Sequence, residues 1–227
     1  MILVTGATGF VGMALCHVLK ASHAVRAVAR LPGGAGLPDS VEIVAGELSC
    51  DEDWSPSLAG VGAVIHCAAR VHVMSEQSAD PLAEFRRVNV DGTMHLAKQC
   101  ALAGVRRFIF VSSIKVNGEQ TRPGSPFVAD QTPNPEDPYG ISKKEAEDSL
   151  RALAQETGME VVIIRPPLVY GPGVKANFLT MMRWLKRGVP LPLGAVMCNA
   201  RSLVALDNLV DLIVTCIDHP DAANQTF

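Results

Sequence analysis

Short apolar runs rich in β-branched residues recur along the chain, separated by segments of helical length. The runs are MILVT, AVRAVA, VEIVA, AVIHCA, RFIFVSS and EVVIIRP, and helices are expected at 10–21, 80–103 and 139–157. Strands that alternate with helices predict βαβ units and a parallel sheet. The runs are apolar on both faces, as strands covered by helices on both sides must be. The sequence therefore predicts an α/β fold with a doubly wound parallel sheet.

The expected helix at 80–103 carries clear signals at both ends. Asp80 is suited to cap its first turn, and Pro81 stands at the first helical position, where a missing N–H is no loss. Gly104 is typical of the residue that follows a helix. The stretch from Asn117 to Pro138 has no periodicity and is rich in turn formers. It is expected to be a long loop over the carboxyl edge of the sheet.

A glycine array follows the first expected strand. The segment TGATGFVG places Gly6, Gly9 and Gly12 in a GxxGxxG spacing, with Phe10 and Val11 at the start of the first helix. Glycines allow a tight turn, the approach of a pyrophosphate to the backbone, and close packing of the helix on the sheet. The helix N-terminus then offers N–H groups and a partial positive charge to the phosphates. A Rossmann-type dinucleotide site is therefore predicted.

The choice between NAD and NADP depends on the end of the second expected strand. An acidic residue there usually binds the adenosine ribose of NAD, but this chain has Ala29 and Arg30. Arginine suits the 2′-phosphate of NADP, and the alternative is a solvated strand end, so NAD and NADP are both kept as candidates. Glu47 and Leu48 follow the third strand, where Glu47 could accept a hydrogen bond from the adenine amino group or be an ordinary surface carboxylate.

Six motifs in order resemble one family. They are TGATGFVG, HCAAR, NVDGT, FVSSIKVNG, PYGISK and RPPLVYGPG, and they span nearly the whole chain. The chain is similar to the extended short-chain dehydrogenase/reductases, in particular the NAD-dependent epimerase/dehydratase branch typified by UDP-glucose 4-epimerase. The resemblance implies a catalytic set of Ser113, Tyr139 and Lys143, with Ser112 as the neighbouring candidate for the serine.

The chemistry expected of this set can be argued from its side chains. A tyrosine that acts as a base near pH 7 needs its pKa lowered by roughly 3 units, about 4 kcal/mol. An ammonium about 4 Å away contributes on the order of 4 kcal/mol at an effective dielectric constant near 20. Because Tyr139 and Lys143 are four apart, they share a helix face, and Lys143 is expected to depress the pKa of Tyr139. The resemblance further implies that Lys143 holds the nicotinamide ribose.

The resemblance also implies contacts elsewhere. Ala68 and Ala69 would let the chain pass close to the cofactor, and Asn89 matches a position that braces the active-site strands. Asn177 and Arg201 match positions that contact the substrate diphosphate. His66 is expected to be structural rather than catalytic.

Some residues depart from the family patterns. Ile114 and Lys115 stand where sugar 4,6-dehydratases carry Asp-Glu, so that reaction is disfavoured. Leu168 replaces the asparagine that 4-epimerases have near the sugar. The main hypothesis is a UDP-hexose 4-epimerase acting through a transient 4-keto intermediate. The alternatives are an NAD(P)H-dependent 4-keto-6-deoxy UDP-sugar reductase of surface polysaccharide synthesis and a non-catalytic dinucleotide-binding protein.

Two regions are expected along the chain. Residues 1–165 would form the dinucleotide-binding part with the catalytic set, and 166–227 a small substrate-binding part. The family normally continues for about a hundred residues more, so this second part is expected to be incomplete, and the closing residues NQTF are expected to enter a strand. The segment NFLTMMRWLKRG predicts an amphipathic helix, closed by Gly188, whose core-facing side carries Phe178, Met181, Met182 and Leu185.

Composition bears on partners and compartment. A net charge of −3 and a pI near 6.1 disfavour nucleic-acid binding. The sequence shows neither a signal peptide nor a membrane span, and its six cysteines lack metal-ligand spacing. A cytoplasmic protein with no metal site and no membrane or nucleic-acid partner is expected. Because the helices at 80–103 and 139–157 are the family's usual dimer surface, the resemblance implies a homodimer.

Overall fold

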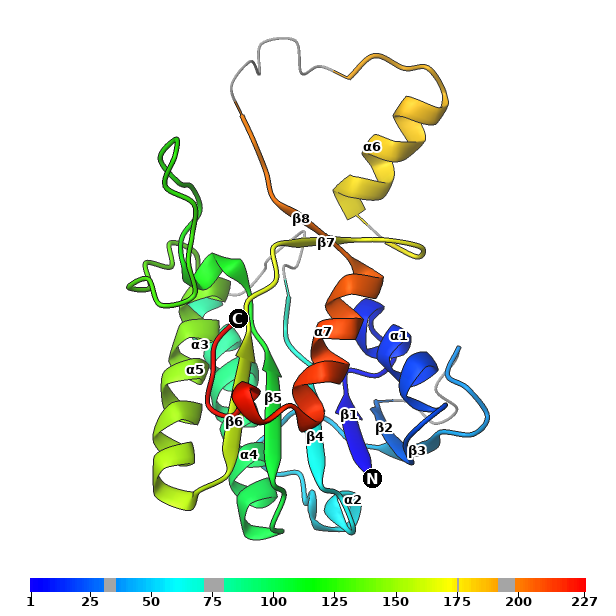
Figure 1. The fold of residues 1–227 in the computed structure, drawn as a ribbon, viewed down its shortest axis with the longest axis vertical. Coiled ribbons are helices and arrows are strands. Elements are labelled where there is room, and N and C mark those ends of the chain that lie inside the picture. The colour runs from blue at the N-terminus through cyan, green and yellow to red at the C-terminus, as the bar shows by residue number, and fades with distance from the viewer. Residues whose placement is uncertain (31–35, 72–79, 175, 192–198) are drawn as a thin grey trace.

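The central element of the computed structural model is a six-stranded, wholly parallel sheet (Figure 1). The structure describes residues 1–30, 36–71, 80–174, 176–191 and 199–227. The strand order is β3-β2-β1-β4-β5-β6, with the strands at Ile2–Thr5 (β1), Val25–Ala29 (β2), Glu42–Ala45 (β3), Ala63–His66 (β4), Arg107–Val111 (β5) and Glu160–Ile164 (β6). The order reverses between β1 and β4, which is where ligands bind in open α/β sheets. The predicted doubly wound sheet is confirmed.

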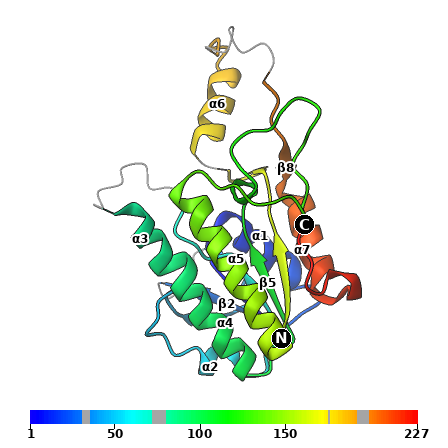
Figure 2. The same ribbon diagram turned by 90° about the vertical axis from the view of Figure 1, so that its left-hand side faces the viewer.

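Helices cover both faces of the sheet (Figure 2). On one face α1 (Phe10–Leu19) and α7 (Leu206–Asp218) pack together over β1 and share one apolar core with it. The other face carries a second core, to which α4 (Thr93–Leu102), α5 (Pro138–Thr157) and the short α2 (Ser55–Leu58) contribute. Two covered faces explain why every residue of β1 and β2 is buried, including Arg26, which donates to the Ser57 carbonyl at 2.7 Å.

The helix expected at 80–103 is continuous but changes its winding. It consists of α3 (Pro81–Arg86), a π-helical turn (Arg87–Gly92) and α4. Asp80 caps it by accepting from the Ala83 N–H at 3.0 Å, and Gly104 follows its end with φ +76°, as predicted. The π turn was not foreseen, and such turns are frequent at functional sites.

A smaller part extends beyond the sheet. It comprises β7 (Leu168–Tyr170), α6 (Ala176–Lys186) and β8 (Leu203–Ala205), and β7 and β8 form a parallel pair. We call these three elements the outer segment, and Figure 1 shows α6 standing away from the sheet. The predicted core-facing side of α6 is wrong for Met182 and Leu185, whose exposed fractions are 46% and 51%, whereas Phe178 and Met181 are partly buried.

The chain ends beside β6. Thr226 forms a parallel bridge with Ile163, and the Phe227 N–H donates to the Ile163 carbonyl at 2.9 Å. The predicted entry into a strand is confirmed. Single 3-10 turns lie at Ile114–Val116 and Pro220–Ala222. Among the helices in the described ranges, none is long and apolar enough to cross a membrane.

Candidate active site

A cavity of about 1820 Å³ lies at the carboxyl edge of the sheet. Its lining combines the loops after β1, β2, β3, β4 and β5 with the start of α5 and the ends of the outer segment. Nearly all of the residues predicted for cofactor, catalysis or substrate line this one cavity: Gly6, Gly9, Phe10, Val11, Gly12, Arg30, Glu47, Leu48, Ala68, Ala69, Ser113, Tyr139, Lys143 and Arg201. Residues scattered over two hundred positions therefore meet at one edge, because parallel strands all end there.

The glycine loop needs its glycines for space. Gly6 has φ +66°, and a Cβ on it would lie 2.7 Å from the backbone nitrogen of Ala68. A Cβ on Gly12 would collide with the carbonyl oxygen of Gly6. Gly9 caps α1 and has no side chain to occupy the first N–H groups of the helix. These groups therefore offer a ready site for the phosphates of a dinucleotide, which fits the residues present.

At the end of β2 the cavity is lined by a basic residue and not by an acidic one. Arg30 is exposed at the end of β2 and lines the cavity. Glu47 is exposed, its backbone N–H bonded to Glu52 Oε2 at 3.1 Å. Leu48 packs where a Cβ on Gly92 would stand, in the π turn. Arginine at this strand end is compatible with a ribose hydroxyl or a ribose phosphate.

The two adjacent serines after β5 have different environments. Ser112 is buried, and its hydroxyl donates to Glu147 Oε1 at 2.5 Å. Ser113 is half-buried, lines the cavity, and accepts a bond from the Lys115 N–H at 3.3 Å. The hydroxyl of Ser112 is thus engaged inside the protein. Of the two candidates, Ser113 has the hydroxyl that a ligand can reach.

Helix α5 supplies the tyrosine and the lysine. Asp137 caps it through a 2.6 Å bond from the Gly140 N–H, and this fixes Tyr139 in its first turn. The Tyr139 ring packs edge-on against Phe85, with ring centroids 6.0 Å apart. Lys143 is buried, its ammonium 4.1 Å from the centre of the Phe110 ring. The ammonium donates to the Val111 carbonyl at 2.8 Å and so joins α5 to the end of β5.

The pKa of Tyr139 departs from the sequence-based expectation. Burial, reinforced by the nearby Asp137 carboxylate, raises it to about 12. Burial lowers the pKa of Lys143 to about 8, partly countered by Cys67 and Glu147. The expected depression of the Tyr139 pKa by Lys143 is therefore wrong for this structure, because burial and the Asp137 carboxylate both raise that pKa and the Lys143 ammonium bonds to the Val111 carbonyl. At neutral pH the phenol is protonated.

Two polar side chains behind the cavity hold its walls together. Asn89, in the π turn, accepts from the Arg70 N–H at 2.8 Å and donates to the Ser142 hydroxyl at 3.1 Å. It thereby ties the loop after β4 to α5, which agrees with the expected bracing role. His66 is fully buried between the hydroxyls of Thr5 (2.7 Å) and Thr93 (3.0 Å), and burial lowers its pKa to about 3. Its placement is that of a structural residue.

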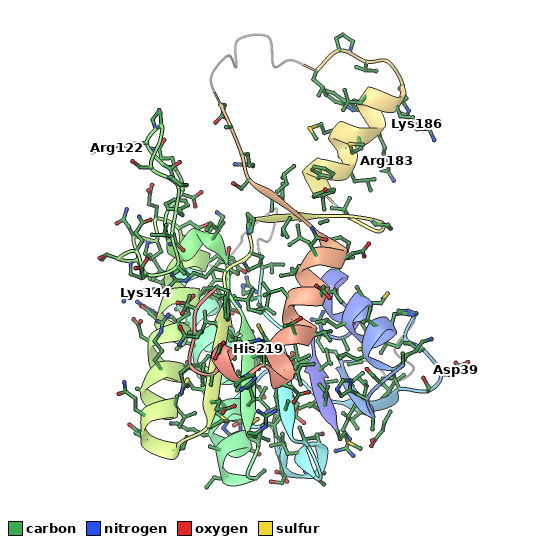
Figure 3. All side chains as sticks on the ribbon, in the orientation of Figure 1. Asp39, Arg122, Lys144, Arg183, Lys186 and His219 are labelled. Atoms are coloured by element: carbon green, nitrogen blue, oxygen red, sulfur yellow. The ribbon has the colours of Figure 1, made fainter. Side chains whose placement is uncertain are left out.

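The substrate side of the cavity is formed by loops. Arg201 is exposed there beside β8, and Leu168 lines the wall from β7. The side chain of Asn177 lies outside the described residues, although its backbone starts α6. Residues 118–124, 126 and 127 of the long loop also line the cavity, which confirms that this loop lies over the carboxyl edge. Figure 3 shows Arg122 near the loop's far end and Lys144 on the outer side of α5.

Two polar groupings at the site were not foreseen. Lys115 bonds to Asp137 at 2.6 Å and to Glu119 at 2.9 Å. Behind the site, Glu147 and Arg165 form a buried ion pair at 2.6 Å. The only sequence signal for the pair is that Glu147 is four residues after Lys143 and shares its helix face. Within the described ranges, no group of three or more His, Cys, Asp or Glu side chains could hold a metal ion.

Comparison with known proteins agrees with this geometry. The family model for the NAD dependent epimerase/dehydratase family matches residues 2–227. A UDP-glucose 4-epimerase of Vibrio cholerae is 52% identical over 228 residues, which cover all of this chain and 69% of that protein. A dihydroflavonol 4-reductase of Zea mays is 30% identical over 99% of this chain and 68% of its own length. The structure of MoeE5 in complex with UDP-glucuronic acid and NAD superposes with a TM-score of 0.81 at 29% identity, over all of this chain and 75% of that one.

Proposed function

The chain belongs to the NAD-dependent epimerase/dehydratase family, and on that premise we propose that it is a UDP-hexose 4-epimerase. The family confirms the predicted resemblance and gives NAD as cofactor. The observation that carries the proposal is that one cavity joins the N-terminus of α1, where no side chain accepts from the first N–H groups, to Ser113, Tyr139 and Lys143. A dinucleotide site and a proton-transferring set at one sheet edge are what oxidation of a sugar hydroxyl requires.

Each side chain has a distinct part in the proposed reaction. NAD, when bound, supplies the acceptance and return of a hydride at the sugar C4. For this step Tyr139 must first lose its own proton: the phenolate then accepts the proton of the C4 hydroxyl and later returns it, while Ser113 donates a hydrogen bond to the same oxygen. Lys143 holds the cofactor ribose and the position of α5 against β5. Return of the hydride to the opposite face of a 4-keto intermediate would invert C4 with no net oxidation.

The sugar nucleotide is proposed to bind between the sheet and the outer segment. Arg201 is exposed on that side, and its guanidinium suits the diphosphate. Phe10 and Val11, with Ala68 and Ala69, form the cofactor side of the same cavity. We accordingly propose that residues 1–165 bind the cofactor and carry the chemistry, while part of 166–227 binds the sugar nucleotide. The proposed homodimer would pair the helices at 80–103 and 139–157.

A second candidate is a 4-ketosugar reductase that uses NADPH. Two observations favour it: Arg30 at the end of β2, and a Tyr139 pKa near 12, which keeps the phenol protonated. In that reaction C4 receives a hydride from NADPH, and its oxygen receives the Tyr139 proton, so that a ketone becomes a hydroxyl. The similarity to a plant reductase shows that the fold is not confined to epimerases.

The two candidates differ in redox balance. The purified chain would be incubated with UDP-hexoses and NAD, and separately with UDP-4-keto-6-deoxy sugars and NADPH. Inversion at C4 without net NADH supports the epimerase, whereas oxidation of one NADPH per product supports the reductase. Replacement of Tyr139 by Phe is expected to lower turnover about 100- to 10,000-fold while NAD binding is retained. Turnover that survives this substitution would refute both.

A further inference from the structure

A buried polar cluster behind the cavity has no part in the chemistry described above. Glu147 on α5 is completely buried, and its carboxylate faces the Arg165 guanidinium, whose side chain is 3% exposed. The Arg165 Nη2 donates to Glu147 Oε2 at 2.6 Å, and the Nε donates to both carboxylate oxygens, at 3.0 and 3.2 Å. A carboxylate in such surroundings must be paired, and each hydrogen bond to it is strong and directional.

The cluster connects the elements that surround the reacting groups. The Ser112 hydroxyl donates to Glu147 from the end of β5, one residue before Ser113. The Arg165 Nη1 donates to Asn117 Oδ1 at 3.2 Å and to the Ala129 carbonyl at 3.3 Å. Asn117 in turn donates to the Val128 carbonyl at 2.9 Å. The hydrogen bonds of the cluster therefore connect α5 to the end of β5, which carries Ser113, and to the base of the long loop.

We propose that the Glu147–Arg165 pair positions two parts of the site. It fixes Ser113 against α5 through Ser112, and it anchors the base of the 117–137 loop over the substrate side of the cavity through Asn117. This inference rests on the proposed function, because it assigns the loop and Ser113 to substrate binding and chemistry. It makes Glu147, Arg165, Ser112 and Asn117 positioning residues.

The segments that these hydrogen bonds join indicate a positioning role and not only a contribution to the stability of the fold. Residues 118–124, 126 and 127 line the cavity, whereas residues 128 and 129 accept the bonds from Asn117 and Arg165, so these bonds hold the loop at its base. Arg165 is followed at once by two prolines that line the cavity wall. Glu147 also counters the effect of burial on the Lys143 pKa. Each partner of the pair is thus next to a residue of the site.

The chain offers a matched control. Arg151 also donates to Glu147, at 3.0 Å, but its side chain is 40% exposed and it reaches Thr226 instead of the loop or β5. Arg151→Ala therefore removes a bond to the same carboxylate without touching either proposed connection. Ser112→Ala and Asn117→Ala each remove one connection and leave the buried ion pair in place, so all three variants are expected to fold.

The test compares kinetic constants of these variants with a UDP-hexose. Ser112→Ala is expected to lower kcat about 10-fold with KM little changed, since a loosened strand end misplaces Ser113. Asn117→Ala is expected to raise KM about 10-fold with kcat little changed, since the loop loses its anchor. Arg151→Ala should stay within about two-fold of the wild type in both constants. Values for the first two variants within two-fold of those for Arg151→Ala would overturn the inference and leave the proposed function intact.

A second measurement does not depend on turnover. Glu119 is exposed in the loop, so a glutamate-specific protease can cleave after it. Cleavage is expected to be several-fold faster in Asn117→Ala than in the wild type and unchanged in Arg151→Ala. If the wild type converts no UDP-sugar while cleavage follows this pattern, the proposed function fails and the anchoring stands. Equal cleavage rates in all three proteins would overturn the anchoring.

Discussion

The sheet body and the outer segment are built by the same chain with opposite degrees of burial. Every residue of β1 and β4 is buried, whereas Leu168 in β7 and Leu203 in β8 are 43% and 46% exposed. The body is a six-stranded sheet between two helical layers. The outer segment is one pair of strands and a helix on which Met182, Trp184 and Leu185 are exposed, and a lone two-stranded sheet is marginal in water.

The difference separates the two tasks proposed for the site. Groups that must be held within fractions of an ångström, such as Tyr139 and Lys143, are on elements of the body that are fixed by buried bonds. The side that would recognise a particular sugar is formed by loops and the outer segment, where packing constrains the backbone less. Chemistry on a rigid body and selection on a less packed rim would let related chains share a mechanism and differ in substrate.

The largest effect on stability is expected when a buried leucine of the sheet body, Leu209, is replaced, in contrast to the exposed Leu185 of the outer segment. Leu209 on α7 is 2% exposed and packs in the core shared with β1 and α1. Leu209→Ala should lower the free energy of unfolding by about 2–5 kcal/mol, since it removes buried methyl groups and leaves a cavity. Urea denaturation measures the change. A loss below 1 kcal/mol would mean that α7 does not belong to the body.

The next effect concerns the glycine loop of the body. Gly12→Val places a side chain against the Gly6 carbonyl, and overpacking of this kind costs about 1–3 kcal/mol. If the strain distorts the phosphate site, NAD affinity should fall roughly 10- to 100-fold. Calorimetric titration with NAD tests this, with Val18→Ala on the exposed part of α1 as the control. Unchanged affinity would separate the glycine loop from cofactor binding.

Lys143 is expected to lower the free energy of unfolding at neutral pH although activity requires it. Burial lowers its pKa from 10.5 to about 8, a difference of roughly 3 kcal/mol, so between these pH values the unfolded chain binds more protons and stability rises with pH. At pH 7, below both pKa values, the full cost of burying the charged ammonium lowers the stability of the folded protein. Lys143→Met should then raise the free energy of unfolding by about 1–2 kcal/mol, because loss of the bond to Val111 offsets part of the gain.

The measurement is the Tm of Lys143→Met and the wild type at pH 7 and at pH 10. The gain should shrink toward pH 10, and turnover should be lost at both. Lys144→Met, on the exposed side of the same helix, should change neither stability nor activity noticeably. A Lys143→Met variant that is less stable than the wild type at pH 7 would show that Lys143 holds the body together as well as serving the site.

The smallest effect is expected in the outer segment. Leu185 on α6 is 51% exposed, so Leu185→Ala should change the free energy of unfolding by less than about 0.5 kcal/mol. It is the counterpart of Leu209→Ala, with the same chemistry on a helix of the other region. A loss as large as that of Leu209→Ala would show that α6 is buried in solution, and the contrast between the two regions would fail.

Several features could be predicted from local pattern alone. Apolar runs on both faces gave the covered parallel sheet, and Asp80 and Gly104 marked the ends of one long helix. The π turn within that helix was not predicted, and its Gly92 packs closely against Leu48 from another part of the chain. The prediction that the apolar face of α6 packs against a core failed for a related reason. The periodicity of α6 defines an apolar face but cannot say which element covers that face.

The sequence by itself determined the fold class and the glycine loop, since these depend on periodicity and spacing, whereas the catalytic set was proposed from the resemblance to a family. Only the tertiary structure decided that Ser112 is buried with its hydroxyl engaged by Glu147 while Ser113 is half-buried, and that the pKa of Tyr139 is raised rather than lowered. It also placed α7 on the sheet body. Burial and long-range pairing set these properties, because desolvation and ion pairing depend on neighbours far apart in sequence.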